Sequence, residues 1–219
     1  MLAFLAAVLM AFSLVVPAHA SQERTVIPLG KAVGIKLFAD GALVVAVENS
    51  AVLQKGDLLL KLKGEEVNSI EEVQALLREN GGDVMTMEVQ RGERILSLAD
   101  TPKQGADGVW RLGVWIRDSM AGVGTVTYYD PATQTYGALG HGITDVDTSQ
   151  LMTLQRGSIM PTSVKAVKRG AAGDPGELKG DFSIQRDIGT LRANTSCGIF
   201  GGAMDLGFFG GEPDRKSVV

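Results

Sequence analysis

The stretch that decides the fold of the first half of this chain is Gly56-Asp57-Leu58-Leu59-Leu60-Lys61-Leu62-Lys63-Gly64. A short leucine-rich run between two glycines predicts a buried strand that enters and leaves through turns. A helix follows, because Ser69 and Glu72 form a capping box ahead of an amphipathic run. Gly81 supplies the left-handed residue that ends it. The sequence therefore predicts a strand–turn–helix unit.

Further strands are predicted on both sides of this unit. Leu43–Val47 is an apolar run, and Met85–Val89 alternates apolar and polar residues. Before them, the loop Gly30–Gly34 can point successive backbone N–H groups inward, which favours binding of a carboxylate or a peptide carbonyl. The strand Ile35–Phe38 follows. If it lies at a sheet edge, an extended peptide can pair with it.

These motifs resemble a bacterial PDZ domain over residues 29–101. The resemblance rests on Gly34-Ile35-Lys36-Leu37, the Gly56–Gly64 stretch, Val67 and the helix. It implies capture of a peptide along Gly34, Ile35, Lys36 and Leu37. The ligand can come from another molecule, or the protein's own chain can occupy the groove in cis, and the sequence leaves both alternatives open.

The second half is glycine-rich and predicts short strands at 110–116, 123–129, 136–139, 158–167 and 198–200. Its chemistry centres on His141, in Gly137-Ala138-Leu139-Gly140-His141-Gly142-Ile143-Thr144-Asp145. Flanking glycines leave the imidazole open, and catalytic groups concentrate on such loops. No second histidine lies at ligand spacing, so we expect no metal site and no cofactor.

The stretch from Trp110 to Pro131, its continuation from Gly140 to Asp147, and Asn194–Gly201 resemble stage IV sporulation protein B. That family comprises exported serine peptidases of spore-forming Firmicutes. The resemblance implies a mostly β fold with an α+β element, in which a PDZ-like domain (29–101) precedes an incomplete trypsin-like β-barrel domain (110–219). It makes His141 the catalytic base, in a protein that acts in sporulation signalling.

The other two members of the family's triad are not found in this sequence. The family's serine lies in a Gly-x-Ser-Gly-x-Pro turn with the aspartate shortly before it, and no serine here is followed by Gly-x-Pro. Asp145 and Asp147 are interpreted as loop and turn residues. Because Asp214–Val219 resembles a translated sequencing adapter, we expect a C-terminally truncated and inactive chain, with both catalytic groups beyond its end.

Two rival functions remain. Cys197 and His141 could form a Cys–His peptidase pair, although the apolar, glycine-rich run around Cys197 predicts a buried structural thiol. The chain could instead be a non-catalytic PDZ-type peptide-binding protein. A coding continuation with the serine turn would favour the enzyme.

Residues 1–20 are almost wholly apolar and end in Ala18-His19-Ala20, which predicts a signal peptide cleaved before Ser21. An uncleaved membrane anchor is the alternative. Either way the protein is exported, and the resemblance places it between mother cell and forespore, with membrane contact only through this segment. With a net charge of −4 and no basic stripe, nucleic acid is not an expected partner. The expected partner is a peptide or protein substrate.

Overall fold

The computed structural model describes residues 24–172, 176–182 and 186–209, so the predicted export segment and the last ten residues lie outside the described part. Within these ranges there is no helix of the length and apolarity that a bilayer span needs. In chain order the elements are β1 (Ile27–Val47), β2 (Leu58–Leu62), β3 (Glu65–Glu66), α2 (Ile70–Asn80), β4 (Met85–Arg91), β5 (Arg94–Asp100), β6 (Lys103–Gln104), β7 (Trp110–Arg111), β8 (Val114–Asp130), β9 (Thr135–Ala138), β10 (Arg156–Lys168), β11 (Glu177–Phe182), β12 (Gly189–Thr195), β13 (Gly198–Gly202) and the short 3-10 helix η1 (Leu206–Phe209).

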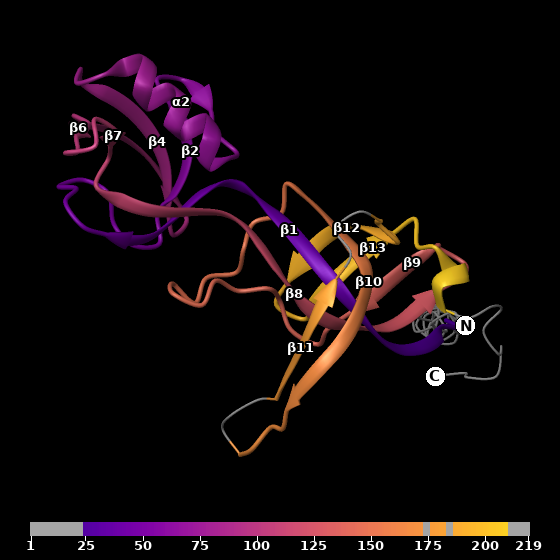
Figure 1. Ribbon diagram of the computed structural model, residues 1–219. Coiled ribbons are helices and arrows are strands. Elements are labelled where there is room, and N and C mark those ends of the chain that lie inside the picture. Colours follow the sequence, from indigo (N-terminus) through magenta and orange to yellow (C-terminus); the bar gives the residue numbers. More distant parts are fainter. Residues whose placement is uncertain (1–23, 173–175, 183–185, 210–219) are drawn as a thin grey trace, which may run out of the picture.

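The first unit packs α2 against β2 and β4, as Figure 1 shows at its upper left. The helix prediction is confirmed. The Ser69 hydroxyl accepts from the Glu72 amide at 3.2 Å, and Gly81, at φ 62°, ends the helix. Asp57, wholly buried at the start of β2, accepts two hydrogen bonds of 2.7 Å from the Arg91 guanidinium at the end of β4. The Asp57–Arg91 ion pair thus connects β2 to β4.

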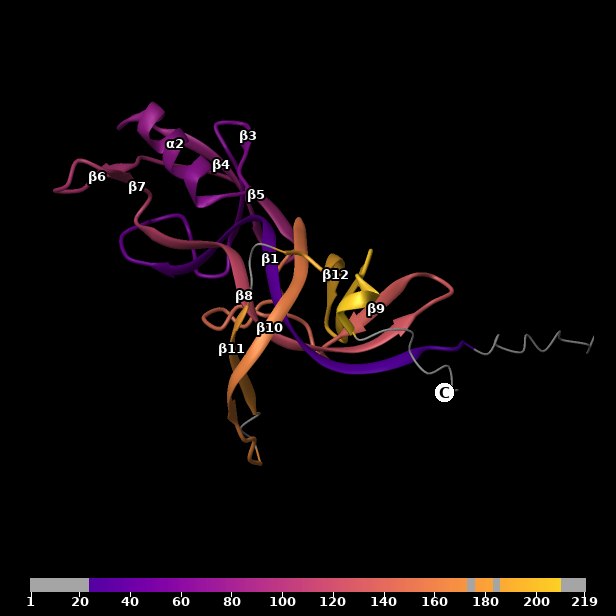
Figure 2. The same cartoon turned by 45° about the vertical axis from the view of Figure 1, so that its right-hand side comes forward.

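β1 and β8 are two long antiparallel strands that run from the first unit into the second (Figures 1 and 2). The separate strands expected at 35–38 and 43–47 are one strand, with a register shift between Phe38 and Leu43. Its Leu43–Val47 part pairs with Val114–Arg117 of β8. Its Ile27–Phe38 part pairs with the rest of β8, so β1 is shared between both halves of the molecule.

The second unit is built from a circuit of hydrogen-bonded neighbours. Its strands follow the order β1, β8, β9, β13, β12 and β10, and β10 pairs back onto β1. Each contributes buried side chains to one core cluster, which consists of Ile27, Val33, Ile35, Val126, Tyr129, Tyr136, Ala138, Ile159, Ile188, Leu191 and Ile199. This core holds the strands that lead to His141.

Strands β1–β5 and β8–β13 form one eleven-stranded sheet that is not closed as a barrel, and β6 and β7 form a separate two-stranded sheet. The expected fold class, mostly β with a PDZ-like unit and one helix, is confirmed. The predicted strand at 110–116 is wrong in one respect. It is broken at Gly113, whose φ is 71° and whose Cβ position lies 2.6 Å from the Asn49 carbonyl oxygen.

Candidate active site

His141 lies on a loop that leaves the core directly after β9. Tyr136 of β9 is fully buried and donates its hydroxyl to the Thr190 carbonyl at 3.0 Å, which fixes the strand. Leu139 then takes a left-handed conformation, φ 63°, and donates its amide to the Thr125 carbonyl at 2.9 Å. This turn sends the chain out of the sheet, and His141 is consequently exposed.

The two glycines beside His141 have different physical roles. A Cβ at Gly142 would lie 2.4 Å from the Thr195 carbonyl oxygen and 2.3 Å from a Leu151 methyl carbon, so only glycine fits there. A Cβ at Gly140 would meet none of the described atoms within 4 Å. Gly142 therefore packs the loop against the turn between β12 and β13, whereas Gly140 leaves the approach to the imidazole open.

Asn194 holds the next part of the loop. Its amide oxygen accepts from the Ile143 backbone at 2.8 Å, and its amide nitrogen donates to the carbonyls of Ile143 at 2.9 Å and Met152 at 2.8 Å. The Asn194 side chain thereby connects the two ends of the loop, at Ile143 and Met152, by hydrogen bonds. Sequence reasoning assigned it no role. The only signal was its place at the start of the Asn194–Gly201 motif.

Asp145 organises the loop instead of orienting His141. Its fully buried carboxylate accepts from the backbone and hydroxyl of Thr148 and from the backbone of Asp147, at 2.8 to 3.0 Å. The Arg117 guanidinium pairs with both Asp145 and Asp147. This confirms the interpretation of the two aspartates as loop and turn residues.

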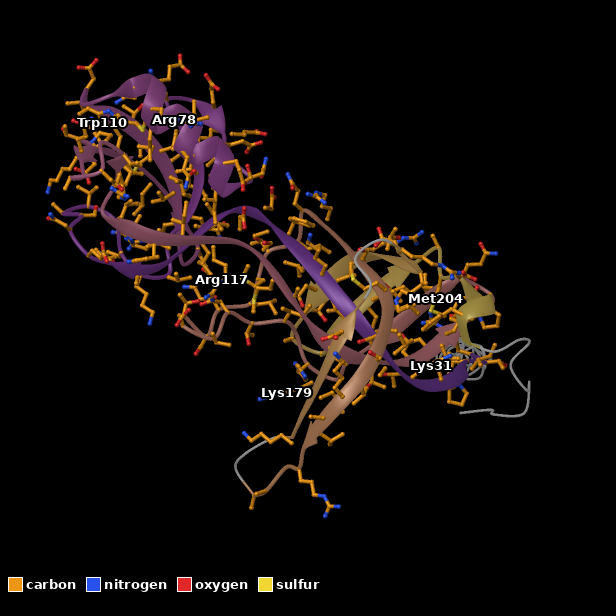
Figure 3. All side chains as sticks on the ribbon, in the orientation of Figure 1. Lys31, Arg78, Trp110, Arg117, Lys179 and Met204 are labelled. Carbon is orange, nitrogen blue, oxygen red and sulfur yellow. The ribbon has the colours of Figure 1, made fainter. Side chains whose placement is uncertain are left out.

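Opposing effects act on the pKa of Asp145. Burial raises the pKa of this carboxyl, but the hydrogen bonds from Thr148 and the charge of Arg117 outweigh burial and lower it. Asp145 therefore stays ionised at neutral pH, while the same contacts raise the pKa of Arg117 against the effect of burial. Figure 3 shows Arg117 where the two units of the molecule meet.

A pocket of about 240 Å³ lies beside His141. One wall is the stretch Met120–Val123 of β8, the other consists of Leu139 and the loop stretch His141–Thr144, and Ile35 of β1 also lines it. The side chains of the lining are apolar apart from His141 and Thr144. The strand β8 and the loop after β9 thus bring an open imidazole to the rim of a small apolar cavity.

The prediction of a peptide-binding edge at Gly34, Ile35, Lys36 and Leu37 is wrong. These residues pair with β8 through Val123, Gly122, Ala121 and Met120, and with β10 through Met160, Ile159, Ser158 and Gly157. Both edges of the strand are therefore occupied in cis, which is the alternative that the sequence left open. A further peptide cannot pair here without displacing one of these strands.

Cys197 is exposed, so the expected buried thiol is also wrong. It lies in the tight turn between β12 and β13, with its sulfur 3.8 Å from the Ser196 hydroxyl oxygen. The apolar character of Gly198–Phe200 belongs to β13 and does not extend to the turn. As for metals, across the described ranges no three histidine, cysteine, aspartate or glutamate side chains gather in a way that could hold an ion.

The described residues thus form a PDZ-like unit joined to a second β unit that presents the exposed His141. Specifically, residues 108–208 match the family described as SpoIVB peptidase S55, and residues 51–91 match the PDZ domain family. These matches confirm the resemblance drawn from the sequence. His141, β8 and Asn194 all lie within the peptidase match.

A relative from Xylella fastidiosa (strain 9a5c), provisionally named a zinc metalloprotease, is 33% identical over 152 residues. The alignment covers 68% of this chain and 31% of that protein, so the chain spans about a third of the length of this curated relative. Among solved structures, the PDZ domain of the SdrC-like protein from Listeria monocytogenes is similar at 20% identity, with a TM-score of 0.33. That similarity covers 35% of this chain and 87% of the solved chain.

Proposed function

We propose that this chain is part of an exported serine endopeptidase of the SpoIVB type that acts in sporulation signalling, with His141 as its general base. The observation that carries the proposal is the exposed His141 at the rim of an apolar pocket, inside the segment that matches the S55 peptidase family. Residues 1–20 direct export in this proposal.

The local geometry suits a base. The Nδ1 atom of His141 lies 2.9 Å from the Gly142 carbonyl oxygen. When Nδ1 carries the proton it donates to this carbonyl, which leaves Nε2 to accept a proton from a nucleophile. In the proposed reaction Nε2 takes the proton of the serine hydroxyl and later returns it to the leaving amine. The serine of this reaction is the one that the family resemblance places in a Gly-x-Ser-Gly-x-Pro turn, a motif that the 219 residues do not contain.

The deciding experiment uses the protein encoded by the complete gene and a fluorophosphonate probe, which reacts with activated serine hydroxyls. We expect labelling of the wild type, and loss of both labelling and peptide-bond cleavage in His141→Ala, with turnover lower by about 10⁴- to 10⁶-fold. The melting temperature should barely change, because His141 is exposed. Equal labelling of wild type and His141→Ala rejects the assignment. The 219 residues by themselves should not cleave peptides.

Cys197 supports a second candidate. Its exposure, together with the contact of its turn with Gly142, keeps the Cys–His alternative open. Iodoacetamide labelling of the 219-residue chain separates the two functions. A nucleophilic Cys197 would label quickly at neutral pH and more slowly in His141→Ala, whereas an ordinary surface thiol would label at the same modest rate in both proteins.

A further inference from the structure

Among the described residues, no strand is hydrogen-bonded to one edge of β8 where that edge passes the His141 pocket. Along its first edge β8 pairs with β1 from Val114 to Tyr129. Along its second edge the described residues pair only from Val126 to Asp130, with β9. The Thr125 carbonyl is also used there, by the Leu139 amide. From Ser119 to Gly124 the outward backbone groups of that edge therefore have no described strand partner.

The beginning of this open edge is set by the helix of the PDZ unit. The Asp118 carboxylate accepts from the backbone of Ile70, the first residue of α2, at 2.9 Å. Its other oxygen accepts from the Ser119 hydroxyl at 3.0 Å. The open edge thus starts where β8 leaves α2 and ends where β9 joins. It is the length of a short extended peptide.

The same edge forms one wall of the His141 pocket. Met120, Ala121, Gly122 and Val123 line the cavity opposite the loop that carries His141. Ala121 and Gly122 are exposed, and a Cβ at Gly122 would meet none of the described atoms within 4 Å. A second backbone can therefore approach β8 closely at this point.

We infer that Met120–Val123 is the strand on which the extended substrate pairs, so that its backbone passes the His141 imidazole. Unpaired strand edges bind extended peptides through main-chain hydrogen bonds, and pockets along the edge select side chains. The inference rests on the proposed function, because it supplies the substrate for that site. The inference goes beyond the proposed function by assigning the strand that binds the substrate and the class of substrate.

The cavity determines which side chain is selected. Its volume of about 240 Å³ is below the roughly 300–1,000 Å³ of pockets that enclose drug-sized ligands. It therefore suits one side chain. Because Ile35, Met120, Val123, Leu139 and Ile143, half of its ten lining residues, present large apolar side chains, the side chain it takes is apolar and uncharged. The substrate is an unfolded or looped segment with an aliphatic residue at the position next to His141.

Amide hydrogen exchange on the full 219-residue chain tests this directly. The probe is an acetylated, amidated heptapeptide of alternating threonine and leucine. Its control is the same peptide with N-methylated backbone amides, which keeps the side chains but cannot pair. At a peptide concentration about nine times Kd, we expect exchange within Met120–Val123 to slow by about tenfold. The internal reference is Val126, Tyr128 and Tyr129, which pair with both β1 and β9 and should not change.

Two variants sharpen the result. Gly122→Phe fills the open approach and should abolish the protection, whereas Trp115→Ala, at an exposed position of β8 outside the pocket, should keep it. Protection by the N-methylated peptide, or protection centred on α2 instead of Met120–Val123, overturns the inference. So does an absence of protection at saturating peptide.

The outcome is separable from that of the proposed function, because binding needs no turnover. His141→Ala should bind the heptapeptide as the wild type does. If serine labelling depends on His141 but Met120–Val123 gains no protection, the peptidase assignment stands and only the substrate strand is wrong. If the heptapeptide protects Met120–Val123 but serine labelling is equal in wild type and His141→Ala, the binding strand is supported and the catalytic role of His141 is rejected.

Discussion

The guanidinium of Arg117 on β8 pairs with the buried carboxylate of Asp145, which lies four residues after His141. Arg117 sits opposite Leu43 of β1, next to the PDZ unit. One ion pair therefore ties the histidine loop to the strand that connects the two halves of the molecule. Its removal leaves an unpaired charge in the protein interior.

We expect Arg117→Ala to destabilise the protein by about 2 to 3 kcal/mol, because the buried Asp145 carboxylate then has no opposite charge beside it. This destabilisation is smaller than the roughly 3–5 kcal/mol typical of a broken buried ion pair. The reason is that Asp145 keeps its hydrogen bonds from Asp147 and Thr148. Urea unfolding at pH 7 measures it. The control is Arg111→Ala, which breaks the solvent-exposed pair with Asp107 and should change stability by less than about 1 kcal/mol. Equal effects would contradict the structural role of Arg117.

The lowered pKa of Asp145 predicts a pH dependence with a definite sign. Because its pKa in the folded protein lies below the unfolded value of about 3.9, the ionised carboxylate stabilises the fold fully above that value. This stabilisation is lost as the pH falls through the folded pKa. The stability difference between wild type and Asp145→Asn should therefore be largest near neutral pH and shrink below about pH 4. Asp147→Asn, at an exposed side chain, is the control with a smaller effect. A difference that stays constant between pH 7 and pH 3 would refute this.

The glycines on either side of His141 should respond differently to a methyl group. Gly142→Ala forces the loop away from Thr195 and should cost about 1 to 3 kcal/mol, as overpacking does. Gly140→Ala adds its methyl to open space and should cost less than about 1 kcal/mol. Thermal melts of the two variants, compared with the wild type, measure the difference. Similar melting temperatures for both variants would show that Gly142 is not a packing contact.

The extent of an independently folding PDZ unit can be tested with two fragments. Residues 29–101 contain the predicted domain. Residues 29–119 add Leu112, which is buried in the core around α2, and Asp118, which caps that helix. One buried leucine and one helix cap together should make the longer fragment more stable by at least about 2 kcal/mol. Urea unfolding of both fragments is the measurement, and equal midpoints would place the boundary at Thr101.

The sequence by itself determined the features that depend on neighbouring residues. The capped helix at 70–80, the strand of the Gly56–Gly64 stretch and the glycine frame of His141 are local signals, since caps and turns are set within a few residues. The long motifs around His141 also indicated the peptidase family.

Only the tertiary structure decided how distant segments pair. Gly34–Leu37 looks like an edge strand in sequence, but β8 and β10, about 85 and 120 residues further along the chain, cover both of its edges. Cys197 looks buried from its neighbours but lies in an exposed turn. Asp145 gains its buried partner, Arg117, from another strand. Strand edges, burial and ion pairs are set by long-range register, which no short stretch of sequence specifies.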